Sequence, residues 1–270
     1  MRFDGGGFYG WQAQSGGNTI QQTLQDAAQS VFGERLGISG CGITDAGVHA
    51  YGYCCHFDLP QAKENFPLER LANALNSYFI SRNIKISITG VKETDPDFHS
   101  RYYIKSKEYI YIIQNNKYRD PFYCGKAYYY FKPLDIDKMR EAARYLTGEH
   151  NFASFMADRS DIKPDEAVRN MHEIKIIEKT LETGTNLAEI YMAASGFLYK
   201  MARIIAGTLL EVSEGRIKTD ELPAIINARD RKKSGRTLPP YGLYLNKIKY
   251  YDKIEETEAI ETTETKTRDN

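Results

Sequence analysis

Segments with helical periodicity and segments with strand periodicity follow one another twice along this chain, and the order restarts near residue 105. In the first run, a Thr19-Ile-Gln-Gln22 capping box opens an apolar face that ends before Gly33, which predicts a capped helix. A second helix is predicted over residues 67–79 and a strand over residues 84–88. The first hundred residues therefore combine helices and strands.

The second run contains more strands. Asp135 opens a helix that we expect Gly148 to close. Further helices are predicted at 198–210 and 220–228, and strands at 108–114, 126–131, 172–177, 187–193 and 241–250. These patterns predict an α+β protein of two similar α/β halves, each a largely antiparallel sheet with helices on one face. Because ligand sites commonly lie where such halves face each other, we expect an active-site cleft between them.

The charge of the chain is unevenly distributed. Its 36 basic and 36 acidic residues give a formal net charge of zero. Residues 252–270 hold seven acidic and three basic residues and almost no apolar ones, which predicts a disordered acidic tail. Residues 1–251 then carry a net charge of +4, and we divide them into an N-terminal domain, 1–104, and a C-terminal domain, 105–251. A mildly basic body is compatible with a nucleic-acid partner.

The apolar segments of the sequence are too short or too charged for a membrane span. The longest helical one, residues 197–210, contains Lys200 and Arg203, whereas a spanning helix needs about 20 nearly uncharged residues. The first ten residues also lack the basic and apolar regions of a signal peptide. We therefore expect a cytoplasmic protein.

Glycine is most concentrated in residues 39–50, SGCGITDAGVHA, where Gly40, Gly42 and Gly47 surround Asp45. Such a segment can turn tightly or approach a ligand closely, so its carboxylate is held in place. One interpretation is an Asx turn, in which Asp45 only accepts backbone N–H groups. The other is a fixed carboxylate that acts as a nucleophile or base and needs a cationic partner.

Possible metal ligands also occur near this segment, at Cys41, His49, Cys54, Cys55 and His56. Adjacent residues of a strand point to opposite faces, and neither CxxC nor HxxxH spacing is present. Buried thiols are therefore favoured over a zinc site.

Tyrosine is abundant, with 20 Tyr against 12 Phe and one Trp. Strand propensity explains many of them, and the others can offer stacking surfaces to splayed RNA bases. Basic residues interleave with these aromatics and form either a phosphate path or a solvated charged face: Arg101, Lys105, Lys107, Lys117 and Arg119.

Arg203 lies within an otherwise apolar helical segment, FLYKMARIIAG. Its side chain can extend along the apolar surface to solvent. If it points into a cleft instead, its guanidinium needs a carboxylate, and Asp45 is the obvious candidate.

Together these motifs resemble those of the TruA-type tRNA pseudouridine synthases. FDGGGFYGWQAQ at residues 3–14, Thr19-Ile-Gln, and GITDAGVHA at residues 42–50 are similar to the first three blocks of that family, the last to its signature GRTDAGVHA. Four later blocks follow in the family's order: FHSRY with KEYIYII, LTGEHNFASF, GFLYKMARIIAGTLLEV and LPPYGLYL. The resemblance covers about residues 3–250.

The resemblance implies isomerisation of uridine to pseudouridine in the anticodon stem-loop of tRNA, typically at nucleotides 38 to 40. It further implies a homodimer that uses neither cofactor nor metal. Asp45 falls on the family's catalytic aspartate, Tyr109 on the tyrosine that packs on the target base, and Arg203 on the arginine that pairs with the aspartate. We expect a second set of residues to contact the RNA: Ile43, Thr44, His49, Arg101 and Lys105.

Three positions depart from the family pattern. Ile43 stands where the family has an arginine that helps to flip the base, Asn151 replaces an acid, and Met156 stands where arginine is common. The departures leave open a catalytically impaired paralogue that acts as a structured-RNA-binding protein, and, with less support, a scaffold without an RNA role. The trio of Asp45, Tyr109 and Arg203 favours the enzyme, because a protein that only binds has no need of a buried carboxylate.

Overall fold

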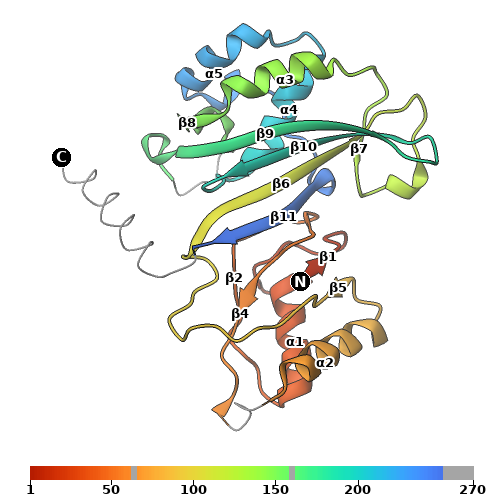
Figure 1. Cartoon of the computed structure of the whole chain (residues 1–270), viewed down its shortest axis with the longest axis vertical. Helices are drawn as coiled ribbons and strands as arrows, with labels where there is room; N and C mark the ends of the chain where they lie inside the picture. Colours follow the sequence, from red (N-terminus) through yellow and green to blue (C-terminus); the bar gives the residue numbers. More distant parts are fainter. Residues whose placement is uncertain (62–65, 158–161, 252–270) are drawn as a thin grey trace, which may run out of the picture.

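The computed structural model describes residues 1–61, 66–157 and 162–251. The predicted acidic tail, residues 252–270, lies outside the described residues. One large sheet runs through the molecule, with helices gathered beyond it at both ends (Figure 1). No helix in the described part of the chain has both the length and the apolar character needed to cross a membrane.

The described strands form a nine-stranded sheet and a separate two-stranded one. The order in the large sheet is β5–β1–β3–β11–β6–β10–β9–β8, with β7 paired to β6. The pairs are antiparallel except β11 with β3 and β6 with β7. The strands are β1 Arg2–Phe3, β3 His49–Ala50, β5 Ile86–Ser87, β6 Ile104–Gln114, β7 Tyr128–Tyr129, β8 Gly148–Asn151, β9 Val168–Thr180, β10 Asn186–Ala194 and β11 Leu243–Tyr250, with β2 Ser39–Gly40 and β4 Cys55–His56 in the small sheet.

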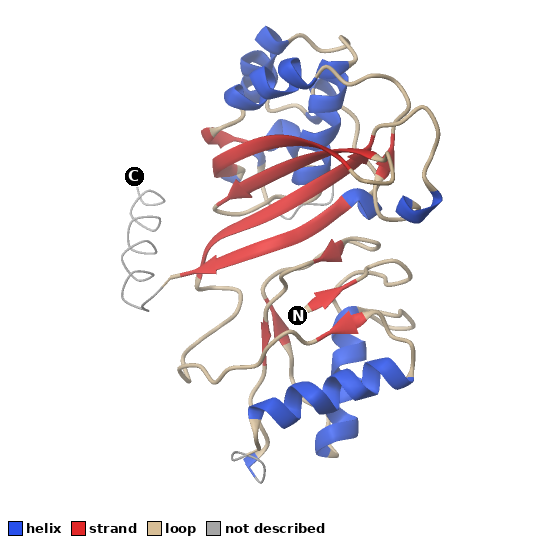
Figure 2. Ribbon diagram, turned by 45° about the vertical axis from the view of Figure 1, so that its right-hand side comes forward, coloured by secondary structure: helices blue, strands red, loops and turns tan. Residues whose placement is uncertain are grey.

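The helices fall into two groups, which Figure 2 shows at opposite ends of the molecule. The first group is α1 Ile20–Phe32 and α2 Leu68–Ser81, and the second is α3 Ile136–Tyr145, α4 Met201–Ser213 and α5 Leu222–Ala228. Both predicted ends of α1 are confirmed, because the Thr19 side chain accepts the backbone N–H of Gln22 and Gly33 adopts a left-handed conformation. A mixed fold with a mostly antiparallel sheet is thus confirmed, whereas the similarity of two halves and a cleft between them stay predictions.

Some predicted boundaries are wrong. The strands predicted over 84–88 and 126–131 shrink to the two residues each of β5 and β7. Gly148 does not close α3, which ends at Tyr145, but begins β8, a strand that the periodicity missed. Gly148 has a φ of +108°, so it turns the chain from the helix directly into a strand that pairs with β9.

Two main apolar clusters form the core. The larger one lies between the sheet and helices α3, α4 and α5, and the smaller one lies around α1 and α2. Strand β11 contributes Leu243 to the larger cluster and Leu245 to the smaller. Tyr109 of β6 packs against both clusters, so the two cores meet at this residue.

Candidate active site

The side chains of Asp45 and Arg203 meet in an ion pair. Nη1 of Arg203 donates to Oδ2 of Asp45 at 2.8 Å, and the two side chains are 11% and 24% exposed, respectively. This confirms the predicted contact and rules out an Arg203 that extends into solvent. A charge-assisted hydrogen bond of this kind fixes the position of the carboxylate. No backbone N–H of the described residues donates to that carboxylate, so the Asx-turn interpretation is wrong.

The turn that carries Asp45 is fastened to the segment near the N-terminus. Trp11 donates its backbone N–H to the carbonyl of Thr44, and Gly47 donates to the carbonyl of Phe8. Gly10 permits this approach, because a Cβ there would lie 2.4 Å from the Thr44 oxygen. Gly10 also has a φ of +91°, which a side chain would strain. The backbone beneath Asp45 is therefore held from outside the turn.

Arg203 is oriented by a backbone segment that follows α5. Its Nε donates to the carbonyl of Leu238 at 2.7 Å, and the N–H of Leu238 donates back to the carbonyl of Arg203 at 3.2 Å. The segment passes very close to α4 at Gly207, where a Cβ would lie 1.8 Å from the carbonyl oxygen of Arg236. The sequence did not predict this support for Arg203, because it depends on a backbone carbonyl and on no motif.

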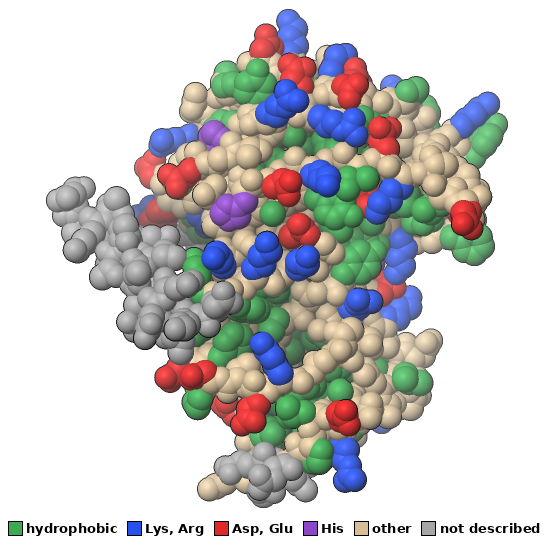
Figure 3. Space-filling model, in the orientation of Figure 1, with side chains coloured by type: hydrophobic (Ala, Val, Ile, Leu, Met, Phe, Trp, Pro, Cys, Tyr) green, Lys and Arg blue, Asp and Glu red, His purple; other side chains and the backbone are tan. Residues whose placement is uncertain are grey.

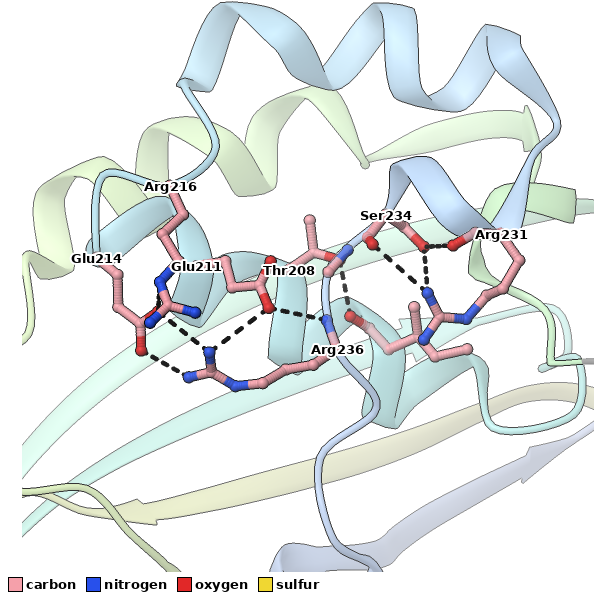
Figure 4. Close-up of polar contacts among 9 residues, drawn as sticks. Thr208, Glu211, Glu214, Arg216, Arg231, Ser234 and Arg236 are labelled. Atoms are coloured by element: carbon pink, nitrogen blue, oxygen red, sulfur yellow. Dashed lines mark hydrogen bonds and ion pairs between the residues drawn. The ribbon is translucent and has the colours of Figure 1, made fainter.

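Figure 4 shows how polar contacts attach the same segment to α4. The guanidinium of Arg236 lies 2.6 Å from Oε1 of Glu214, and its backbone N–H donates to Glu211. The hydrogen bond from Arg236 lowers the pKa of Glu214. One residue earlier, Gly235 donates its N–H to the hydroxyl of Thr208. These contacts hold the segment whose carbonyl orients Arg203.

Tyr109 lies on β6, close enough to Asp45 for the two to interact electrostatically. Its ring meets that of Phe197 edge to face, with centroids 4.9 Å apart. Burial raises the pKa of Tyr109, and the neighbouring Cys41 and Asp45 add to this effect, so the phenol stays protonated near neutral pH. The predicted trio is thus assembled from three distant parts of the chain.

The predicted RNA contacts differ in position. Ile43 is 61% exposed beside Asp45, and Arg101 and Lys105 are also exposed. Thr44 is only 5% exposed, and its Oγ1 has no hydrogen-bond partner among the described residues. An unpaired buried hydroxyl costs free energy unless a ligand completes its bonding.

His49 occupies a structural position. It is 1% exposed, and its Nε2 lies 3.1 Å from the carbonyl oxygens of Gly125 and Tyr241. Its Nδ1 accepts the N–H of Gly5 and lies 2.9 Å from the carboxylate of Asp4. Burial lowers the pKa of His49, which favours the neutral ring. Because both ring nitrogens are engaged inside the protein, the structure does not support the predicted RNA contact of His49.

Asp4 makes polar contacts that were not predicted from the sequence. Its carboxylate is ion-paired with Lys126 and Lys85 as well as lying beside His49. Burial alone would raise the pKa of Asp4, but the hydrogen bonds from Lys126 and from the Gly6 N–H lower it to about 2. The run at residues 3–7, in which three glycines follow the acid, was the available signal.

The described residues form no candidate metal site. Among residues 1–61, 66–157 and 162–251, no three His, Cys, Asp or Glu side chains are grouped to hold a metal ion. The four cysteines are free, and burial raises the pKa of Cys41 to about 11 and that of Cys55 to about 12.

Comparison with known proteins places this chain in a family. A family model described as tRNA pseudouridine synthase matches residues 142–251. A tRNA pseudouridine synthase A of Caldicellulosiruptor saccharolyticus is 38% identical over 250 residues, which cover 93% of this chain and 97% of the relative. A tRNA pseudouridine synthase A of Bacillus licheniformis is 39% identical over 252 residues with the same coverage. The chain belongs to the tRNA pseudouridine synthase A family.

Proposed function

We propose that this enzyme, a tRNA pseudouridine synthase and hence an isomerase, converts uridine to pseudouridine in the anticodon stem-loop of tRNA, at nucleotides 38 to 40, with Asp45 as the catalytic carboxylate. The observation that carries this proposal is the Asp45–Arg203 ion pair, which lies at the boundary of the two cores beside Tyr109. We further propose that the active site lies in a cleft between the domains 1–104 and 105–251. Asp45 comes from the first domain, and Tyr109 and Arg203 come from the second.

The reaction exchanges one bond of the uracil ring for another. The bond between N1 and the ribose C1′ breaks, a bond between C5 and C1′ forms, C5 loses a proton and N1 gains one. The product is therefore an isomer, and the net reaction requires no oxidant or reductant. The carboxylate of Asp45 either attacks C6 of the base or removes a ribose proton, and both routes need it in a fixed position.

Each residue of the trio has a separate task in this proposal. Arg203 holds the carboxylate of Asp45 in one orientation and is itself held by the Leu238 carbonyl. Tyr109 packs on the uracil, keeps the detached base in place, and helps to exclude water from the site. The target nucleotide must first leave its stack, which costs a few kcal/mol. Ile43, exposed beside Asp45, is placed to contact the RNA where the base leaves.

The surface supports a polyanionic substrate. On the face drawn in Figure 3, Lys and Arg side chains form a row across the middle of the molecule, over the large sheet. Basic residues at such a surface attract the phosphates of RNA. We expect the protein to act on tRNA in the cytoplasm as a homodimer. A structured-RNA-binding protein without activity is not favoured, since the relatives reported above carry the names of enzymes.

The test is pseudouridine mapping of tRNA from cells with and without this protein. Cells without it should lack pseudouridine at one or more of nucleotides 38 to 40, and the wild-type protein should restore it. An Asp45→Asn variant should not restore it, whereas the control Asp26→Asn, which changes a partly exposed acid on α1 that pairs with Arg35, should. An unchanged map in the absence of the protein, or full restoration by Asp45→Asn, would overturn the proposal.

A further inference from the structure

The ammonium group of Lys107 lies under the turn that carries Asp45. Lys107 is on β6, two residues before Tyr109, so both side chains leave the same face of the strand. Their Cα atoms are about 6.6 Å apart along a strand of ordinary rise. A Cβ atom on Gly42 would lie 2.8 Å from Nζ of Lys107, which places this nitrogen directly against the turn.

Lys107 has no anionic partner among residues 1–61, 66–157 and 162–251. Its ammonium makes no hydrogen bond or ion pair with the described residues, although the side chain is half-buried. Among the described residues, Cys41 and Arg101 are close enough to act electrostatically on this ammonium. Burial raises the pKa of the Cys41 thiol to about 11, so this neighbour is neutral near pH 7. A half-buried positive charge therefore lies within the electrostatic range of a second positive charge, that of Arg101.

This arrangement is unfavourable in the free protein. Withdrawing an ammonium from water without a partner costs free energy, and the nearby guanidinium of Arg101 adds repulsion. Burial lowers the pKa of Lys107, and Arg101 lowers it further. An anion between the two cations would remove both penalties. Lys105, on the same strand, is exposed and carries no such penalty, and Arg203 has Asp45 as its partner.

We propose that Lys107, assisted by Arg101, binds the phosphodiester group adjacent to the target uridine. This proposal rests on the proposed function. If the target base packs on Tyr109, the phosphate next to that nucleotide lies about one nucleotide length from the base. This length is comparable to the distance between the Cα atoms of residues 107 and 109 along β6. Lys107 then fixes the position of the ribose relative to Asp45, so that it acts in selecting the reacting nucleotide and not only in attracting RNA.

The first experiment compares two lysine variants by equilibrium binding to a tRNA anticodon arm. Lys107→Met keeps most of the apolar stem and removes the charge, and Lys249→Met is the matched control, since Lys249 is an exposed lysine on neighbouring β11 opposite Ser106. Lys107→Met should weaken binding by about tenfold or more, as expected for a lost charge-assisted hydrogen bond, and Lys249→Met by much less. Equal effects of the two variants would overturn the proposal.

A third variant covers the case in which Lys107→Met does not fold. Gly42→Ala changes no charge, and Gly42 has an ordinary φ, but the new methyl group must displace Nζ of Lys107. Like Lys107→Met, it should weaken binding to the anticodon arm, while its thermal unfolding temperature stays near that of the wild type. Wild-type affinity in a folded Gly42→Ala protein would contradict the placement of the phosphate at this nitrogen.

The second experiment identifies the phosphate by replacing single linkages of the arm with neutral methylphosphonates. At the linkage bound by Lys107, the wild type should lose about tenfold in affinity and Lys107→Met should lose almost nothing more, a coupling that a double-mutant cycle measures. Additive losses at both linkages flanking the target uridine would overturn the proposal. Since this readout is binding, it decides the role of Lys107 even if the wild type forms no pseudouridine, a result that would refute only the proposed function.

Discussion

Arg203 and Asp45 are 158 positions apart in the sequence, yet Nη1 of the guanidinium donates to Oδ2 of the carboxylate at 2.8 Å. The opposite side of the guanidinium is occupied as well, because its Nε donates to Leu238. Two hydrogen bonds from different edges of a planar group leave it one orientation. The carboxylate is thereby presented in a fixed direction before any substrate binds.

Replacing Asp45 by Asn should abolish pseudouridine formation and leave tRNA affinity within a few fold of the wild type. The amide keeps the size and polarity of the side chain but removes the charge that the reaction needs. Single-turnover assays with purified protein measure the rate, and a filter or fluorescence assay measures the affinity. A rate near that of the wild type would refute the catalytic role of Asp45.

Ile43→Arg should speed the reaction on a folded anticodon arm more than on the same sequence unpaired. An arginine offers up to five donors to the vacated base edge or a phosphate, whereas isoleucine offers only apolar surface. Flipping a stacked base costs a few kcal/mol, so the gain on the folded arm should be roughly ten- to a thousandfold. Equal gains on both RNAs, or none on either, would show that base extraction is not what Ile43 limits.

Thr44→Val should leave the stability of the fold unchanged or slightly raised and weaken RNA binding by roughly three- to tenfold. The hydroxyl of Thr44 has no partner among the described residues, so its loss breaks no internal hydrogen bond. The control is Thr208→Val, whose hydroxyl bonds to both Ile204 and Gly235 and whose loss should cost about 1–3 kcal/mol of unfolding free energy. Unchanged RNA affinity in Thr44→Val would exclude the predicted contact.

Asp4→Asn should make the protein less stable at pH 7 but not at strongly acidic pH. The pKa of Asp4 is about 2 in the folded protein, below its ordinary value of about 3.9, so its stabilisation is complete above about pH 4 and is lost as the pH falls toward 2. Denaturant unfolding should show a loss on the order of 2 kcal/mol at pH 7 that shrinks steadily between pH 4 and pH 2. A difference independent of pH would mean that packing, and not charge, is what Asp4 contributes.

Removal of residues 252–270 should leave the fold intact and RNA affinity unchanged or higher. The tail carries a net charge of −4 and the remaining chain +4, so the tail opposes a polyanion. Affinity of both proteins should fall clearly as salt is added, since phosphate contacts release counterions. Binding that is lost with the tail, or that does not respond to salt, would contradict this expectation.

Local sequence patterns predicted the features that depend on neighbouring residues. The Thr19 and Gly33 ends of α1 are set by one side chain and one backbone conformation, so both were found. The partnership of Asp45 and Arg203 was also predictable, because a buried cation needs an anion and few were available. Strands of two residues, such as β5 and β7, have too few positions for an alternating pattern to mark their ends.

The missed contacts depend on segments that only the tertiary structure brings together. The Leu238 carbonyl that orients Arg203 is a backbone group, and every residue carries one. Lys107 and Gly42 meet because β6 passes under the turn, and neither residue is unusual in its own segment. His49 belongs to the signature motif, but its side chain is buried and its ring lies against the carbonyl oxygens of Gly125 and Tyr241 inside the protein. A motif therefore marks a region of the chain and does not separate the residues that meet the substrate from those that support them.

The place of β11 in the sheet has a consequence for the order in which the enzyme is made. This strand is the last one described, and it lies between β3 and β6 in the large sheet. Strand β3 follows the Asp45 turn and β6 carries Tyr109, so in the described sheet these two strands are linked only through β11. A ribosome delivers residues 243–250 after every other described strand and helix, so neither half can be joined through the sheet during most of synthesis. Contacts of such long sequence separation form slowly. The candidate site is therefore joined through the sheet only after residues 243–250 have been translated, and a nascent chain that stops before residue 243 holds both parts of the site without this connection.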